Sequence, residues 1–489
     1  MIKKFGFTLI VAIAALFLVL VIRAGTFKSR QLAAEPTEGI PISRTAALAH
    51  LAAAIQLKTV SLQTPAANAG AFIAFHALIA RAFPRINRQL NKETVGEHSL
   101  LFTWQGKNDR LKPMLLMAHI DVVPVDQSTE SSWHHAPFSG DIAGGYIWGR
   151  GAMDDKSSVL AILEAVESLL ASNFRPARTI YLAFGHDEEI GGINGAAKIA
   201  ALLRARHVEL ESILDEGLNV FTGVISGLDS PAALIGIAEK GYLSLELSVE
   251  SAGGHSSMPP EHSAIDILMA ALQKLKDAPF PARLNRPTRE MFAFLGPEMA
   301  FDKKLVLANL WLFSSLLEKA LAQSPQTNAL IRTTLAPTML NAGYKDNVLP
   351  SKASAVVNLR IAPGESTASA TQYVRHMIAD PAVTILPQAV QLEPSAVSSI
   401  DSASFEVLHK TIRQTIPTAV VAPALLVAAT DSRHYRSLTN NIFRFLPVTV
   451  RPDDIDRYHG IDERISVEDY ERCIRFYAQL IINSNAPMR

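Results

Sequence analysis

The sequence contains only one cysteine, Cys473, among its 489 residues. The chain therefore cannot close a disulfide bond within itself, and it cannot hold zinc through a cluster of thiolates. No cysteine follows the apolar segment near the N-terminus, which excludes a lipoprotein. Cys473 lies in a helical pattern near the C-terminus, so we expect a free, buried thiol.

The sequence also lacks net charge, because 46 Lys and Arg residues balance 46 Asp and Glu residues. Without an excess of basic residues, nothing in the composition favours nucleic acid as a partner. We find no internal repeat and no low-complexity tract. Hydrophobic residues make up 48% of the chain, which is enough for a large core and indicates two domains or more.

Long apolar runs are absent except for one, residues 5–22, which follows Lys3 and Lys4 and ends at Arg23. Its length is about the minimum for a bilayer span and is long for the apolar part of a signal peptide. No clean cleavage site follows directly, and Ala33-Ala34 is a weak candidate further on. We therefore favour an uncleaved signal anchor over a cleaved, secreted form. The flanking positive charges nearly balance, so they leave the orientation open.

The pattern of apolar and polar residues changes near residue 238. Residues 241–250 (GYLSLELSVE) and 353–361 (ASAVVNLRI) alternate apolar and polar side chains, which is typical of half-exposed, antiparallel strands. Before and after this block, short apolar runs alternate with helical patterns. We expect a transmembrane helix at 1–23, a linker at 24–41, a catalytic domain in two parts at 42–238 and 396–489, and an inserted domain at 239–395.

Polar side chains follow several apolar runs at the point where each run ends. Residues 114–118 read as a buried strand that ends in His119-Ile120-Asp121, and residues 179–184 read as a second that ends in the segment 186–189 (HDEE). A third short strand ends in Asp215-Glu216. Because open α/β sheets keep their sites at the carboxyl ends of strands, we expect these side chains to meet.

Asp154 and Asp155 add two more carboxylates at the start of a predicted helix over 157–171. Taken alone, Asp154 and Asp155 would simply place negative charge at the positive end of the helix dipole. Likewise, a lone His-x-Asp motif such as His119-Ile120-Asp121 is more often a hydrogen-bonded structural pair than a metal site. Several carboxylates at buried strand ends, however, repel one another unless a cation neutralises them. The combination therefore predicts a metal site with acid–base groups beside it.

An ordered series of motifs runs through the chain from about residue 45 to 485. The series resembles the dizinc aminoacylase, acetylornithine deacetylase and carboxypeptidase S family of metallopeptidases. Its pieces are AHIDVVP (118–124), GRGAMDDK (149–156), HDEEIGG (186–192), LDEG (214–217), GGHSS (253–257), NVLP (347–350), VNLRI (357–361) and YHGIDE (458–463). The segments NALIRTT (328–334), TDSR (430–433) and YHGIDERIS (458–466) look most like the carboxypeptidase S branch, which also holds the N-fatty-acyl amino acid synthase/hydrolase.

The resemblance implies the fold and the metal ligands. It implies an α/β chain with a zinc-peptidase-like catalytic domain, whose mixed sheet is flanked by helices, and an inserted α+β lid domain. Two Zn²⁺ ions are implied, with Co²⁺ or Mn²⁺ as alternatives. The implied ligands are His119, Asp154 as the bridge, Glu189, Asp215 and His459. Glu216 is a rival to Asp215, because spacing alone does not separate the two.

The resemblance also implies a hydrolytic mechanism. Asp121 would orient His119 and raise its basicity. Two zinc ions bridged by one carboxylate would activate water and polarise the scissile carbonyl. Glu188 would act as the general base and return the proton to the leaving amine. No nucleophilic serine or cysteine is needed.

Three further residues are candidates for substrate contacts. In the family, the histidine that corresponds to His255 stabilises the tetrahedral oxyanion, often across a dimer. Arg360 and Asn347 would bind the substrate's carboxylate and backbone. Each residue also has a plainer interpretation. His255 would be a solvated histidine in a turn, Arg360 a charge at a strand edge and Asn347 a turn residue. A further four histidines are more typical of structural or surface positions than of ligands: His134, His135, His186 and His434.

We therefore expect a membrane-anchored dizinc hydrolase with an exported catalytic domain (periplasmic, extracellular or lumenal). It would cleave the amide bond to a C-terminal amino acid, in a small peptide or an N-acyl amino acid. One alternative is reversible condensation of fatty acids with amino acids, and another is a non-catalytic peptide-binding protein. The segment 280–335 is longer than a minimal lid requires, which leaves open whether the chain forms a homodimer.

Overall fold

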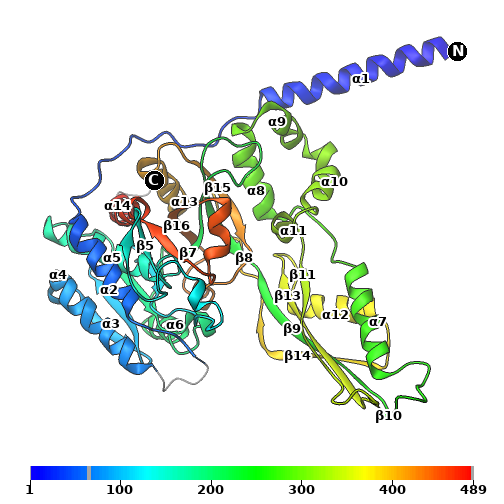
Figure 1. Cartoon of the computed structure of the whole chain (residues 1–489). Coiled ribbons are helices and arrows are strands. Elements are labelled where there is room, and N and C mark those ends of the chain that lie inside the picture. Colours follow the sequence, from blue (N-terminus) through cyan, green and yellow to red (C-terminus); the bar gives the residue numbers. More distant parts are fainter. Residues whose placement is uncertain (1, 63–67, 486–489) are drawn as a thin grey trace.

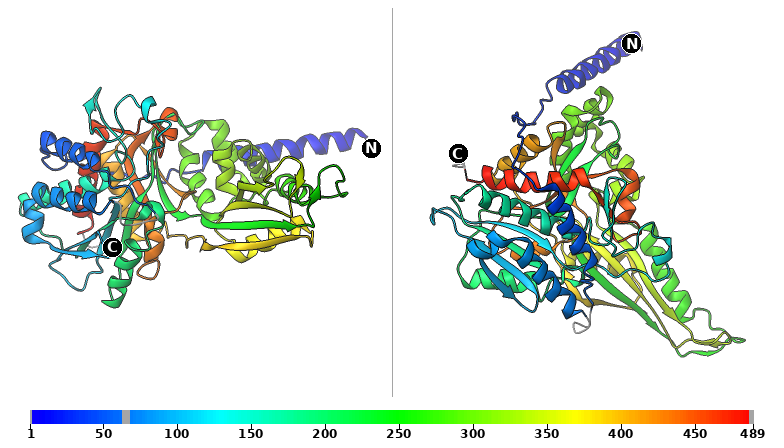
Figure 2. Two further views of the ribbon diagram at one scale, coloured as in Figure 1. Left: turned by 60° about the horizontal axis from the view of Figure 1, so that its bottom comes forward. Right: turned by 60° about the vertical axis from the view of Figure 1, so that its left-hand side comes forward.

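The computed structural model describes residues 2–62 and 68–485 (Figure 1). Residue 1 of the expected anchor, residues 63–67 of the first catalytic part and residues 486–489 of the second lie outside the described residues. The described chain forms a main body around a large sheet and a second, smaller body that projects from it. Figure 2 shows this projection from two further sides.

The large sheet is mixed, and its strand order is β1-β2-β6-β3-β7-β16-β8-β15. Strands β6, β3, β7 and β16 run parallel to one another in the centre. Strand β2 is antiparallel to β1 and β6, and β8 is antiparallel to β7 and β16. The strands are β1 (Asn91–Val95), β2 (Ser99–Trp104), β3 (Met114–His119), β6 (Ile180–Gly185), β7 (Ser212–Phe221), β8 (Ala232–Glu239), β15 (Val420–Leu426) and β16 (Ile442–Val450). The prediction of an α/β fold with a mixed sheet is confirmed.

Helices cover both faces of this sheet, which explains why its central strands are apolar throughout. Successive side chains of β3 point to opposite faces: Leu116 packs in the core with α5 and α14, whereas Leu115 and Met117 pack in a second core with α6. The helices of the main body are α2 (Arg44–Gln56), α3 (Ala69–Ala82), α4 (Pro84–Gln89), α5 (Lys156–Ala171), α6 (Ala196–Ala205), α13 (Ala403–Thr415) and α14 (Val467–Asn483). Cys473 is a free, buried thiol on α14, as expected.

The second body contains a four-stranded antiparallel sheet in the order β11-β13-β9-β14. Its elements are β9 (Gly241–Glu250), α7 (Ala264–Asp277), β11 (Thr334–Ala342), β13 (Lys352–Ile361), α12 (Thr367–Ile378) and β14 (Val383–Leu392). The alternating segments expected to be strands are β9 and β13. Leu245, Leu247 and Val357 on their inner face pack in a separate core with α7 and α12. At the far end, β10 (Gly254–His255) pairs with β12 (Val348–Leu349).

The segment 280–335 forms a group of helices, which lies in the sequence between α7 and β11 of the second body. It comprises α8 (Arg286–Leu295), α9 (Phe301–Ala308), α10 (Leu310–Leu321) and α11 (Pro325–Ile331). The sequence order places this extension within the inserted domain, but its packing is different. Phe292, Phe294 and Leu295 of α8 belong to the core of the main body, and α8 lies along β15 (Figure 1).

The N-terminal helix α1 (Ile2–Gly25) projects from the molecule (Figure 1). Within the described residues, its segment Lys4–Gly25 is the one helix long and apolar enough to cross a membrane, judged by length and composition. The linker that follows is held against the main body. Gln31 donates to the carbonyl of Val421 at 2.9 Å and accepts from its backbone N–H at 2.8 Å.

The buried ring of His409 also holds this linker, and we expect it to make stability depend on pH. Its Nε2 accepts a hydrogen bond from the N–H of Leu32 at 3.4 Å, and burial lowers its pKa from 6.5 to about 4. Between these values only the unfolded chain binds the proton, so the free energy of unfolding falls as the pH falls from 6.5 to 4, by up to about 3 kcal/mol. Denaturant titrations at pH 7 and pH 4.5 should show that His409→Gln loses less free energy of unfolding between these two pH values than the wild-type protein does. An equal loss in both proteins would contradict this assignment.

Candidate metal centre

The carboxyl ends of β3 and β6 and the middle of the neighbouring β7 position the candidate site. Strand β7 does not end at Asp215-Glu216, as expected, but continues to Phe221. Strand β3 ends at His119, which pairs in register with Gly185 at the end of β6. The chain then continues from β6 into a short 3-10 helix, Glu188–Ile190, while β7 carries Asp215 and Glu216. Asp154 comes from the loop before α5, and His459 comes from the segment between β16 and α14. The predicted convergence at this edge of the sheet is therefore what the structure shows.

Three of these side chains form a first group. The Nε2 atom of His119 lies 2.8 Å from Oδ1 of Asp154 and 3.3 Å from Oε1 of Glu216. The potential ligand atoms of the three residues all lie within 4.8 Å of one another. One nitrogen and two carboxylate oxygens at this spacing can hold a metal ion such as zinc.

A second group shares Asp154 with the first. Its other oxygen, Oδ2, lies 3.1 Å from Nε2 of His459, and the same nitrogen lies 3.3 Å from Oε2 of Glu189. These ligand atoms also lie within 4.8 Å of one another. The two oxygens of Asp154 therefore face two different groups, which is the arrangement expected of a carboxylate that bridges two ions.

Asp121 connects the histidine of the first group to the acidic segment beside it. Its Oδ1 lies 3.3 Å from Nδ1 of His119, and the same ring nitrogen lies 3.1 Å from the carbonyl oxygen of Asp121. Its two carboxylate oxygens also accept from the backbone N–H groups of Glu188 and Glu189, at 3.2 and 3.1 Å. These contacts leave Nε2 of His119 facing the first group, as the sequence interpretation expects for an orienting carboxylate.

The preferred assignment of Asp215 as a ligand disagrees with the geometry. Its Oδ2 accepts from the backbone N–H of Ser432 at 2.9 Å, and its Oδ1 accepts from the N–H of Glu216 at 3.0 Å. These bonds hold the carboxylate toward the segment 430–432, while Glu216 joins His119 and Asp154. The correction follows from the strand itself, because adjacent residues of β7 point to opposite sides.

A pair of variants tests this correction. We expect Glu216→Ala to bind about one metal ion fewer per chain than the wild-type protein, because it removes a donor of the first group. Asp215→Asn keeps the shape of the side chain and should bind as many ions as the wild type. Elemental analysis of dialysed protein gives the ratio. Loss of an ion from Asp215→Asn alone would restore the original assignment.

The electrostatics of the cluster favour a bound cation. Burial, followed by the nearby Asp154 carboxylate, raises the pKa of Glu216 to about 8, and burial also raises that of Glu189. Hydrogen bonds to Asp154 and Glu189 raise the pKa of His459 to about 10. Oε1 of Glu189 is buried without a hydrogen-bond partner. These residues therefore fit a metal ion, which would satisfy the orphaned oxygen and offset the repulsion between the carboxylates.

Two distant loops of the site are held together by residues that had no predicted role. Oε2 of Glu463 accepts from the Arg150 guanidinium at 2.6 Å, and its Oε1 accepts from the backbone N–H groups of Gly151, Met153 and Asp154 at 2.8–3.1 Å. The same arginine donates to the carbonyl oxygen of His459 at 3.0 Å. This buried pair thus joins the loop of the bridging aspartate to the loop of the late histidine. Both residues lie inside quoted motifs, but no spacing distinguishes them there.

Asp431 is a second residue that the sequence interpretation left without a role. Its carboxylate is buried, and burial raises its pKa well above the usual value. A Cβ atom on Gly192, whose φ is +67°, would lie 1.9 Å from its Oδ1. The glycine in the HDEEIGG motif is therefore required both by backbone conformation and by the approach of Asp431.

The structure does not bring His255 or Asn347 to the metal groups of the same chain. His255 lies on β10 at the outer end of the second body (Figure 1), where its Nδ1 accepts from the N–H of Ser257 at 3.1 Å. Asn347 lies beside it, and its carbonyl oxygen accepts from the N–H of Ser256. Arg360 lies at the opposite end of this sheet, near the main body, with its guanidinium 4.9 Å from the centre of the Tyr242 ring.

The four histidines expected to be structural have other partners. Nδ1 of His186 lies 2.6 Å from the hydroxyl of Ser99, and Nε2 of His434 lies 3.1 Å from the carbonyl oxygen of Gly191. His134 and His135 contact Asp462 and Asp141 at 2.5 and 2.9 Å. Neither metal-binding group found among residues 2–62 and 68–485 includes any of the four.

Comparisons with known proteins agree with this site. The family described as peptidase family M20/M25/M40 matches residues 115–483. The probable carboxypeptidase S-like 2 of Dictyostelium discoideum is 45% identical over 415 residues, which cover 84% of this chain and 79% of the relative. The N-fatty-acyl-amino acid synthase/hydrolase PM20D1.1 of Danio rerio is 40% identical over 490 residues, which cover 98% of this chain and 94% of the relative.

A solved structure shows the same fold. The M20 family metallo-carboxypeptidase Sso-CP2 from Sulfolobus solfataricus aligns with a TM-score of 0.66 over 89% of this chain and 98% of that one, at 18% identity. The resemblance inferred from the motif series is therefore confirmed, including the carboxypeptidase S and N-fatty-acyl amino acid synthase/hydrolase branches. The chain belongs to peptidase family M20/M25/M40, a family of metallopeptidases.

Proposed function

We propose that this protein is a dizinc hydrolase that cleaves the amide bond to a C-terminal amino acid, as a carboxypeptidase or an N-acyl-amino-acid hydrolase. The observation that carries the proposal is the position of Asp154, whose two oxygens face two separate groups of ligands. His119 and Glu216 complete one group, and Glu189 and His459 complete the other. Bound zinc ions would lower the pKa of water and polarise the scissile carbonyl.

Glu188 moves the proton in this proposal. Its backbone is held by Asp121, next to the ligand Glu189, and it belongs to neither metal group. Burial raises its pKa well above the usual value of a glutamate. A carboxylate with a raised pKa can take a proton from the attacking water and return it to the leaving amine. The carboxyl group of Glu188 therefore serves first as base and then as acid.

Arg360 supports a substrate with a free carboxylate. Arg360 is half-buried. Burial lowers the pKa of its guanidinium, and the positive charge of Arg433 in the main body lowers it further. Two arginines that approach across the junction of the two bodies attract an anion, and a guanidinium pairs well with a carboxylate. An aminopeptidase would instead need an acidic group for the substrate's amine.

His255 and Asn347 keep their proposed roles only in an assembly. Because they lie at the outer end of the second body, they would have to contact the metal centre of another copy. We therefore propose a homodimer in which His255 stabilises the oxyanion of the neighbouring site and Asn347 contacts the substrate. In this arrangement the second body acts as the lid.

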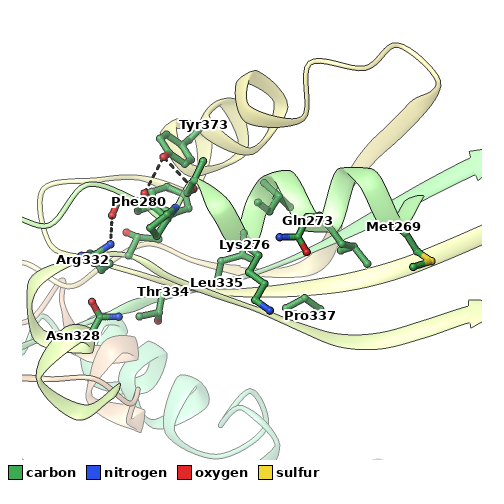
Figure 3. Close-up of a pocket in the computed structure, with 15 residues that line it drawn as sticks. Met269, Gln273, Lys276, Phe280, Asn328, Arg332, Thr334, Leu335, Pro337 and Tyr373 are labelled. Atoms are coloured by element: carbon green, nitrogen blue, oxygen red, sulfur yellow. Dashed lines mark hydrogen bonds between the residues drawn. The ribbon is translucent and has the colours of Figure 1, made fainter. Parts of the chain in front are cut away.

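A second candidate function is the reversible condensation of fatty acids with amino acids. A cavity of about 450 Å³ lies between α7, β11 and the segment that follows α11 (Figure 3). Leu272, Leu275 and Leu335 give it an apolar lining, and Lys276 and Arg332 supply positive charge. Such a cavity suits an acyl chain with an anionic end. The name of the Danio rerio relative agrees with this chemistry.

The location of the protein also belongs to the proposal. Helix α1 would anchor the chain in a membrane as an uncleaved signal anchor, with the catalytic domain exported. The bilayer would then be a partner of the protein in addition to its small-molecule substrate. A cleaved, secreted form is the alternative.

A panel of substrates tests the proposed function. Hydrolysis of carbobenzoxy-Gly-Leu and of long-chain N-acyl amino acids would be measured with zinc-loaded and chelator-treated protein. We expect turnover that is lost after chelation and restored by zinc. Preference for the lipidic amides would favour the second candidate. No turnover of any member by protein that demonstrably binds zinc would contradict both and favour a peptide-binding protein.

A further inference from the structure

We propose that an apolar surface on α9 and α10 lies in the interfacial layer of a lipid bilayer, next to the end of α1. This surface, called here the α9–α10 surface, consists of Phe301, Trp311, Leu312 and Leu316. The inference rests on the proposed membrane anchor, and it adds a second point of attachment that fixes how the main body sits on the membrane.

The exposure of these side chains is the first observation. Phe301 is 58% exposed, Trp311 is 56% exposed and Leu316 is 60% exposed. All of them lie on two consecutive helices, α9 and α10, whereas isolated exposed apolar residues are normal on a soluble protein. Several large apolar side chains exposed in one short segment indicate contact with another molecule or with a membrane.

The sequence of α10 (LWLFSSLLEKAL) gives the second observation. Leu310, Leu317 and Leu321 pack against the core of the main body, but none of the helix's residues is fully buried. Trp311, Leu312 and Leu316 point elsewhere and are exposed. The helix therefore carries apolar side chains on a second face that the described chain leaves uncovered.

Contacts between α1 and the α9–α10 segment indicate that lipid covers this exposed face. Asn309, between α9 and α10, donates to the carbonyl oxygen of Leu20 at 3.0 Å, and Arg23 donates to that of Ala308 at 3.3 Å. Leu20 and Ala24 are buried, whereas most of α1 is exposed. The last turns of α1 are therefore held against α9, as Figure 1 shows.

The length of α1 sets the level of this contact in a bilayer. The apolar segment Lys4–Gly25 has 22 residues, which span about 33 Å at 1.5 Å per residue, close to the ~30 Å thickness of the hydrocarbon layer. Residues 20–25 then lie at the membrane surface. Because Asn309 is bonded to Leu20, the junction of α9 and α10 lies at that level too, and Trp311 and Leu312 follow this junction directly.

The chemistry of the surface suits this depth. Tryptophan prefers the boundary between lipid and water, where its ring is apolar and its N–H finds polar partners. Lys303 of α9, Lys319 of α10 and Arg23 near the end of α1 can meet lipid phosphates. A helix with lipid contacts on one face and the protein core on the other matches an interfacial helix.

Trp311 provides the experiment, because the other tryptophans of the described chain are buried or half-buried. The full chain would be reconstituted in phosphatidylcholine vesicles with or without lipids brominated along the acyl chain, which quench nearby tryptophan. We expect brominated lipid to reduce the fluorescence of the wild-type protein, and Trp311→Phe to lose that quenching. The double variant Leu312→Gln/Leu316→Gln should show weaker quenching by brominated lipid, but it should sediment with vesicles as the wild-type protein does.

The outcomes separate this inference from the proposed anchor. Wild-type protein that sediments with vesicles but shows no quenching of Trp311 would overturn the inference alone. The inference would also be overturned if the fluorescence of Trp311 shifted to the blue with increasing protein concentration and were not quenched by brominated lipid. That result would indicate contact with a second copy of the chain. Protein that does not sediment with vesicles would overturn the anchor and the inference together, while hydrolysis, measured on the same sample, would still test the catalytic proposal.

Discussion

Replacing Glu188 by glutamine is expected to lower kcat by about 10²–10⁴-fold without changing the metal content. The amide has the shape of the carboxylate but cannot take a proton from water. Glu188 belongs to neither metal-binding group, and its position depends on the backbone contact with Asp121, which the substitution leaves intact. Steady-state hydrolysis, together with elemental analysis of the same preparation, measures both quantities.

A surface glutamate provides the matched control. Glu209, whose side chain is largely exposed, pairs only with Lys112 at 2.9 Å in the described chain. Glu209→Gln should hydrolyse substrate at the wild-type rate. If Glu188→Gln retained kcat within about threefold of the control, the assignment of the general base would be wrong, because removal of a general base costs much more.

Arg150→Met is expected to destabilise the protein by about 3–5 kcal/mol and to abolish hydrolysis, because it leaves the charge of Glu463 buried and unpaired. Arg150 is 3% exposed, and Glu463 is fully buried. The substitution also removes the donor to the carbonyl oxygen of His459. The loops that carry Asp154 and His459 would then lose their connection. Chemical denaturation and the hydrolysis rate measure the two effects.

An exposed pair shows what the buried position adds. Arg206 and Glu93 are paired at 2.6 Å, but both side chains are partly exposed. Arg206→Met should therefore cost only about 0–1 kcal/mol and leave hydrolysis unchanged. Equal losses of stability in the two variants would show that burial of the Arg150–Glu463 pair has no special importance.

The candidate site was largely predictable because its residues follow strongly apolar strands. The run before His119 is short and apolar enough to specify a strand buried on both faces, and the same is true of the run before Glu188. Strand direction then places the polar residues at one edge of the sheet. Local pattern thus indicated where the site lies before any tertiary contact was known.

The choice between Asp215 and Glu216 was not predictable from such patterns. Both residues lie in the same strand, β7, and both are carboxylates. Which of them faces the site depends on the register of β7 and on the N–H of Ser432, more than 200 residues later, which takes Asp215 as its acceptor. A hydrogen bond between residues so far apart in the sequence does not affect the local pattern of apolar and polar residues.

Long-range packing also explains the parts of the fold that were missed. Strand β11 was not predicted, because it is an edge strand with mostly exposed side chains and a proline at position 337. The packing of α8 on β15 joins residues more than a hundred positions apart. The Arg150–Glu463 pair has the same origin, because only the folded chain brings its two motifs together.

A metal titration of hydrolysis tests the dinuclear centre directly. Metal-free protein would receive increasing amounts of zinc while bound metal and turnover of the preferred substrate are followed together. We predict two ions per chain, with activity that reaches its maximum as the second site fills, and one ion fewer for Glu216→Ala. Full activity with one ion per chain, or activity that does not depend on metal, would contradict the proposed dinuclear centre.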